Sequence, residues 1–291
     1  MHASTYSGTF QSTVHRATIP GLIIAVSLFA NAAPLSAKML QTQSTSIDAV
    51  TGATRQPGDL NLVVGSSLEY QTDSEETEYN FPFFAEYGIT EQLTFLLEPS
   101  YTVIQSKDGD SVSGMGDLET SLTYEFIEEG EYLPAFAVEG GVKWPTADKE
   151  QIGTGETDYM VGLLASKKIG HVDAEINAIY TFVGSPPGAD LKDTLEGSLA
   201  FEWHITPVFD LLGEVVTSSG SISAFGGQPG TRGGANGTLA ADESSGSETE
   251  GTVGFAEHLG DNLKIEQGVT YQSDGTWQVV VGWEWDFAGG D

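Results

Sequence analysis

Hydrophobic and polar side chains alternate with a period of two residues along most of the chain. In the segment 172–182, for example, Ile176 and Tyr180 lie on one face, and Glu175 and Asn177 lie on the other. Such alternation is typical of a β-strand with one apolar and one polar face. The pattern predicts about twelve strands, at 60–71, 79–87, 93–102, 117–126, 136–144, 159–165, 172–182, 195–203, 209–215, 250–255, 263–271 and 277–287.

Three further features favour a transmembrane barrel over a soluble sandwich, which also alternates. Short connections between the predicted strands alternate along the chain with connections that are mostly longer, as in outer-membrane barrels. Aromatic residues lie near strand ends on the apolar face, where interfacial girdles form. The final strand is aromatic on one face and ends near Phe287. We therefore expect an all-β fold, a single transmembrane antiparallel up-and-down β-barrel of about twelve strands.

The first 37 residues have the layout of a secretory signal peptide. Arg16 precedes an apolar run at 21–30, and small residues follow, with candidate cleavage sites after Ala33 and Ala37. The apolar run is about half the roughly 20 residues that a membrane-spanning helix needs. We expect a cleaved signal peptide that ends at Ala37, with Ala33 as the alternative.

The rest of the chain divides around the predicted barrel. Residues 38–57 are polar without a clear period, which predicts a flexible periplasmic lead, with a small plug as the alternative. Residues 58–287 form the barrel and include a Gly- and Ser-rich extracellular loop at 217–247. Residues 288–291 form a short C-terminal tail.

The charge of the chain is strongly negative, with 42 acidic against 11 basic residues and a formal net charge of −31. A nucleic-acid partner is excluded, because binding phosphates requires a basic face. Two interpretations remain: a solvated surface suited to a salty habitat, or an acidic lumen that favours cations or neutral solutes. The absence of cysteine excludes disulfides and thiol chemistry.

The polar face of the predicted strands carries many carboxylates and few cations. We expect the acidic residues of the lumen to be Glu69, Glu98, Glu125, Glu139, Asp173, Glu175, Glu202, Glu214, Glu266 and Glu284, and the lumen cations to be Lys143 and Lys264. A buried carboxylate without a partner is costly, so these groups need water or cations around them. A lumen packed by lysine–carboxylate pairs is the alternative, although the lysines are too few to pair with every carboxylate.

Three histidines follow the predicted signal peptide, and each falls in a predicted short turn at the periplasmic rim: His171, His204 and His258. Turns spread around a barrel do not converge on one metal ion, nor do they place a histidine beside a lipase serine on the lipid-facing wall. We therefore expect solvated turn residues, and we predict no catalytic residue, no metal site and no cofactor.

A group of landmarks within 116–184 carries a family resemblance. Gly116-Asp117-Leu118 opens one strand, Leu133-Pro134-Ala135 enters the next, and that strand runs through Gly140-Gly141-Val142-Lys143-Trp144-Pro145-Thr146. Gly153-Thr154-Gly155, Asp158-Tyr159 and Tyr180-Thr181-Phe182-Val183-Gly184 follow. This stretch resembles the outer-membrane transporters of the meta-pathway of phenol degradation type. The resemblance implies a barrel that takes up small, often aromatic or hydrophobic compounds.

The expected function is that of a bacterial outer-membrane channel or transporter for small solutes, without enzymatic activity. The expected partners are outer-membrane lipid, small-molecule solutes and, through the C-terminal strand, the barrel assembly machinery. The main alternative is a structural or adhesive barrel with a plugged lumen and no transport. An enzyme and a soluble binding barrel with an apolar cavity are the remaining alternatives.

Overall fold

The computed structural model describes residues 62–72, 76–149, 152–187, 191–219, 248–273 and 275–287. This part of the chain is built from β-strands, and it contains no helix that is long and apolar enough to cross a membrane. The strands are β1 (Leu62–Thr72), β2 (Glu76–Thr90), β3 (Leu93–Glu98), β4 (Ser100–Ser106), β5 (Ser111–Met115), β6 (Leu118–Ile127), β7 (Ala135–Trp144), β8 (Asp158–Ile169), β9 (Val172–Phe182), β10 (Thr194–Thr206), β11 (Phe209–Ser218), β12 (Glu248–Leu259), β13 (Leu263–Gln272) and β14 (Trp277–Asp286).

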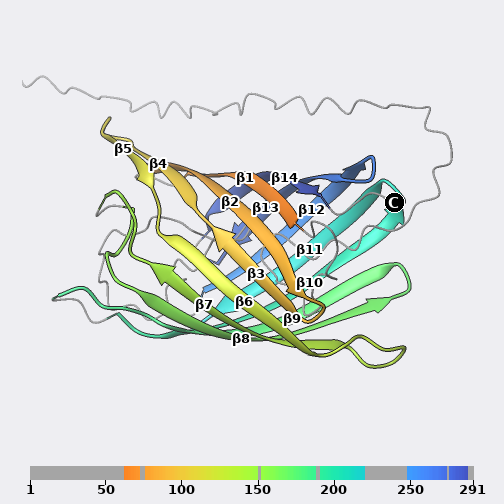
Figure 1. Cartoon of the computed structure of the whole chain (residues 1–291). Helices are drawn as coiled ribbons and strands as arrows, with labels where there is room; N and C mark the ends of the chain where they lie inside the picture. Colours follow the sequence, from red (N-terminus) through yellow and green to blue (C-terminus); the bar gives the residue numbers. More distant parts are fainter. Residues whose placement is uncertain are drawn as a thin grey trace, which may run out of the picture. The chain divides into compact units, whose positions relative to one another are not determined.

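The strands form a closed antiparallel barrel (Figure 1). Each strand from β6 to β14 pairs with its neighbour in the sequence, and β1 closes the barrel by pairing with both β14 and β2. The long strand β2 pairs with β3 over one half and with β4 over the other. Because β3 and β4 form one interrupted strand, and β5 and β6 another, the 14 segments make a 12-strand barrel. The expected fold and strand number are therefore confirmed.

Two of the twelve strands are interrupted, which the alternation does not predict. Pro99 separates β3 from β4; it has no N–H to donate to a ladder, while its carbonyl accepts a bond from the Phe83 N–H at 2.9 Å. On the next strand, Gly116 separates β5 from β6 and lies against Ser100. A Cβ at Gly116 would lie 2.2 Å from the Ser100 hydroxyl oxygen, so a larger residue at 116 would require the Ser100 hydroxyl to move.

The connection expected between the predicted strands 93–102 and 117–126 is mostly strand instead of loop. The structure extends the hairpin of β4 and β5 into it, with Gln105 paired to Ser111, so that only residues 107–110 form the turn. The β4–β5 hairpin projects at one end of the barrel in Figure 1.

The connections differ in length at the two ends of the barrel. One end, here called the short-turn end, carries the connections 91–92, 128–134, 170–171, 207–208 and 260–262. The other end, here called the long-loop end, carries 73–75, 107–110, 145–157, 183–193, 219–247 and 273–276. This alternation agrees with the prediction and is the pattern of outer-membrane barrels, whose periplasmic turns are short.

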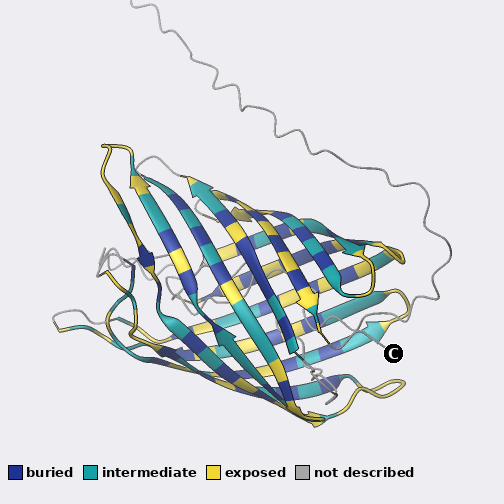
Figure 2. Cartoon of the chain, turned by 45° about the horizontal axis from the view of Figure 1, so that its top comes forward, coloured by how far each residue is buried: buried dark blue, intermediate teal, exposed yellow. Residues whose placement is uncertain are grey.

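Exposed and buried residues alternate along the strands, as the bands in Figure 2 show. The outward face is apolar: Leu163 is 63% exposed, Ile176 60% and Val253 69%. The inward face holds polar and charged residues together with small apolar ones such as Ala137 and Ala200. This arrangement is the reverse of a soluble protein, and a hydrocarbon environment outside the barrel accounts for it.

Exposed aromatic side chains lie near both ends of the strands. At the short-turn end these are Tyr87, Phe126, Trp203, Trp285 and Phe287. At the long-loop end they are Trp144, Tyr159, Phe182, Tyr271 and Trp277. Two belts of this kind are typical of the two interfaces of a membrane, where amphipathic rings are stabilised.

Several predicted segments lie outside the described residues. These are the signal peptide at 1–37, the lead at 38–57, most of the long loop at 217–247 and the tail at 288–291.

Candidate functional site

The charged inward face of the barrel is the candidate functional site. The structure buries nine of the ten acidic residues predicted for the lumen and leaves Asp173 half-buried. The predicted cations Lys143 and Lys264 are 2% and 1% exposed. The buried acidic residues are Glu69, Glu98, Glu125, Glu139, Glu175, Glu202, Glu214, Glu266 and Glu284.

Lys143 forms ion pairs with two carboxylates near the long-loop end. It is the ninth residue of β7, and its Nζ lies 2.5 Å from Asp158 Oδ2 on β8 and 3.8 Å from Asp117 Oδ2. Asp158 Oδ1 accepts the Gly184 N–H at 2.8 Å, and Asp117 Oδ1 accepts the Ala147 N–H at 2.9 Å. The cluster therefore anchors the connections 145–157 and 183–193 to the barrel wall.

The middle of the barrel contains carboxylates that face one another. Glu98 on β3 and Glu119 on β6 are directly opposite in the ladder, and both are buried. Elsewhere Glu69 accepts a bond from the Asn80 amide at 3.0 Å, and Asn80 in turn accepts one from the Thr102 hydroxyl at 3.0 Å. Like charges directly across a strand pair are destabilising unless water or cations separate them.

Lys264 organises the acidic residues near the short-turn end. Its Nζ lies 2.6 Å from Glu266 Oε1 on the same strand and 3.4 Å from Glu202 Oε1 on β10. In the ladder, Lys264 is opposite Glu284 on β14 and His258 on β12. Four of the predicted site residues, Glu202, Lys264, Glu266 and Glu284, are thus brought together, although Glu202 on β10 is far in the sequence from the other three on β13 and β14.

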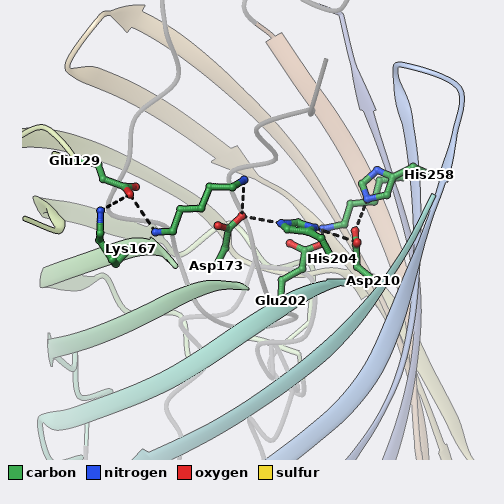
Figure 3. A network of polar contacts seen from close by, with 9 residues as sticks. Glu129, Lys167, Asp173, Glu202, His204, Asp210 and His258 are labelled. Atoms are coloured by element: carbon green, nitrogen blue, oxygen red, sulfur yellow. Dashed lines mark hydrogen bonds and ion pairs between the residues drawn. The ribbon is translucent and has the colours of Figure 1, made fainter. Parts of the chain in front are cut away.

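Two histidines join this end of the inward face, as Figure 3 shows. His204 Nδ1 lies 3.0 Å from Asp210 Oδ1, and His204 Nε2 lies 2.9 Å from Asp173 Oδ2. On the other side of Asp210, His258 Nε2 bonds Oδ2. Lys168 Nζ extends the network, at 3.5 Å from Asp173 Oδ2.

The prediction that all three histidines are solvated turn residues is wrong for His204 and His258. Strand β10 continues to Thr206 and β12 continues to Leu259, so both histidines lie inside strands, and their side chains are only 14% and 13% exposed. Only His171, in the two-residue turn 170–171, is exposed as expected.

The signal that identifies the two histidines was present in the sequence. Glu202 and His204 are two residues apart on one strand, as are Ala256 and His258 on another, so each histidine continues the inward face of its strand. His204 and His258 also contact the same carboxylate, because β10 and β12 are both neighbours of β11, which carries Asp210.

The inward face has a definite electrostatic character. Its carboxylates outnumber its lysines, and buried oxygens of Glu98, Glu139 and Glu202 include atoms without a hydrogen-bond partner in the described part of the chain. Walls of one charge sign concentrate counter-ions and repel co-ions. The arrangement can therefore attract cations into the barrel.

No protein-family model and no curated protein matches the chain. Among solved structures, the barrel is similar to the COG4313 outer membrane channel from Pseudomonas putida F1, with a TM-score of 0.60, 14% sequence identity, and coverage of 80% of this chain and 98% of that one. It is also similar to the NanC porin, with a TM-score of 0.53, 11% identity, and coverage of 77% and 100%. At these identities the likeness concerns the fold, and the chain therefore has the fold of an outer-membrane β-barrel.

Proposed function

We propose that the chain is an outer-membrane channel or transporter that passes small solutes through the acidic interior of its barrel. The observation that carries the proposal is the combination of an apolar outward face with an inward face rich in buried carboxylates. Carboxylates in such number need water or cations beside them. A hydrated passage along the barrel axis supplies both.

The outward face supports a location in the outer membrane. Its exposed apolar residues and its aromatic residues at both strand ends fit hydrocarbon and the two interfaces. We propose that the short-turn end faces the periplasm, since outer-membrane barrels place their short turns there. Strand β14, aromatic on its outward face, is the proposed contact with the barrel assembly machinery.

The charge of the interior supports cations or neutral molecules as the solutes. The ten predicted acidic residues line the proposed passage together with Lys143 and Lys264. Small aromatic compounds are the solute class implied by the resemblance to the phenol meta-pathway transporters. We propose no catalytic step and no cofactor for transport, because selectivity follows from wall charge and passage width.

A plugged structural barrel is the second candidate. The observation that favours it is the low exposure of the interior groups: Glu139 and Glu175 are 1% exposed and Glu202 is 0% exposed. Inward side chains with so little exposed surface fill much of the barrel and leave a narrow passage. A narrow passage conducts only small ions or none.

Single-channel recording on the refolded barrel separates these candidates. The protein is purified in detergent, its folding is verified by the mobility shift between unheated and heated gel samples, and it is added to a planar bilayer. We expect discrete conductance steps that heat-denatured protein does not produce. A folded barrel that inserts without conducting would contradict the channel and favour the plugged scaffold.

A further inference from the structure

The group of polar residues at the short-turn end includes three residues whose side chains could bind one metal ion. Glu202, Asp210 and His258 each offer one ligand atom, and these atoms lie within 4.8 Å of one another. The three residues come from β10, β11 and β12, which are consecutive in the barrel. We infer that this trio is a binding site for a divalent transition-metal cation such as Zn²⁺.

The donor set determines the class of metal. One imidazole nitrogen with two carboxylate oxygens suits Zn²⁺ and related transition metals, since imidazole is among their common ligands. Ca²⁺ prefers six to eight oxygen ligands, and Mg²⁺ prefers an octahedron of oxygens. Three protein ligands leave a fourth position of a tetrahedral ion for water or a solute.

Glu202 provides an observation that is independent of the spacing. Its side chain is 0% exposed, and its carboxylate lies beside that of Asp210, with no well-aligned N–H or O–H donor to either oxygen in the described residues. Its ion pair with Lys264 is loose, at 3.4 Å, because the same Nζ lies 2.6 Å from Glu266. A carboxylate oxygen of Glu202 lies within 4.8 Å of the ligand atoms of Asp210 and His258, and Figure 3 shows the three side chains together. A buried carboxylate that lacks a close donor has lone pairs available for a metal ion.

The surroundings of the trio fix the orientation of its central ligand. Asp210 Oδ1 is held by His204 Nδ1 at 3.0 Å, which leaves Oδ2 beside His258 Nε2. His204 is itself held by Asp173 at 2.9 Å. Hydrogen bonds of this kind orient the carboxylate ligands of metal sites, and their loss typically lowers metal affinity 10–100-fold. His204 is thus a positioning residue.

The local charge favours a cation. The charged groups in and around the trio are two lysines and five carboxylates, the carboxylates coming from five strands: Lys168, Lys264, Asp173, Glu202, Asp210, Glu266 and Glu284. The carboxylates outnumber the lysines, and a divalent ion reduces this imbalance in a place from which bulk water is largely excluded.

Isothermal titration calorimetry of the folded barrel with Zn²⁺ tests the inference. The protein is prepared without a polyhistidine tag, because such a tag would itself bind Zn²⁺. We expect one Zn²⁺ per barrel with a Kd in the micromolar range or below. His258→Gln and Asp210→Asn are expected to weaken binding at least tenfold, and His204→Gln about 10–100-fold. His171→Gln is the matched control, because it removes an exposed imidazole at the same end and is expected to leave the Kd unchanged.

Two additional readouts make the outcome decisive. Co²⁺ is expected to give visible absorption bands in the unmodified barrel that both ligand variants lose, and Ca²⁺ is expected to bind far more weakly than Zn²⁺. The inference is overturned if the folded, unmodified barrel binds no stoichiometric Zn²⁺, if Ca²⁺ binds equally well, or if His171→Gln weakens binding as much as His258→Gln. Because the titration requires only a folded barrel, absence of conductance would leave this site intact.

Discussion

Replacing Val281 with arginine is expected to destabilise the folded barrel in a lipid bilayer by about 2–4 kcal/mol, the usual cost of a cation at the midplane on a lipid-facing wall. Val281 lies in the middle of β14 and is 40% exposed on the outward face. The loss arises because hydrocarbon cannot solvate the guanidinium group. Equilibrium unfolding by guanidinium chloride in liposomes measures it.

Gln278→Arg on the same strand is the matched control. Gln278 is 3% exposed on the inward face, opposite the polar residues Gln71 and Thr270. We expect a smaller loss of unfolding free energy there than at Val281. Equal losses at the two positions would show that the outward face does not meet lipid.

Replacing Lys264 with methionine is expected to lower the unfolding free energy by about 3–5 kcal/mol, as when one partner of a buried ion pair is removed. Methionine keeps much of the volume but leaves Glu202 and Glu266 without the ammonium group between them. The same unfolding assay measures the loss.

Lys107→Met is the control for Lys264. Lys107 lies in the exposed turn between β4 and β5, where its Nζ donates to the hydroxyls of Thr72 and Thr77 at 2.9 and 2.7 Å. We expect a change within about 0.5 kcal/mol, as for most surface substitutions. A loss below about 1 kcal/mol for Lys264→Met would mean that bulk water solvates the carboxylates around Lys264.

The strands could be predicted from the sequence because their signal is local. A period-two pattern with an apolar outward face identifies a strand without knowledge of its partners, and each predicted strand corresponds to one strand of the barrel. The strand interruptions at Pro99 and Gly116 were harder to predict from the sequence. Pro99 is visible in the sequence, but the close approach of Gly116 to Ser100 appears only in the folded barrel.

The sequence predicts which residues face the interior better than it predicts which of them contact one another. Alternation placed Glu202 and Lys264 on the inward face, but their contact joins β10 and β13 past the two strands between them, β11 and β12, and therefore depends on the closed barrel. His204 and His258 were placed in turns, because strand ends are harder to locate than strand centres. An error of a few residues at two strand ends therefore concealed the network around Asp210.

The reversal potential of single barrels in a planar bilayer, under a KCl gradient, tests the acidic passage most directly. At physiological salt the screening length is about 8 Å, comparable to the radius of a small pore, so the wall charge acts across a narrow passage. We expect cation preference that weakens near 1 M salt, where this length falls to about 3 Å.

The variants refine this measurement by removing the same number of carboxylates in two places. Replacing Glu125, Glu202 and Glu214 with glutamine is expected to reduce the cation preference strongly, because all three are buried on the inward face. Replacing the exposed turn residues Glu128, Glu131 and Asp261 with their amides is expected to change it little. The predicted result is a reversal potential that shows cation preference in the unmodified barrel and that only the glutamine variant of Glu125, Glu202 and Glu214 reduces. Anion preference of the unmodified barrel, or equal effects of the two sets of substitutions, would contradict an acidic passage.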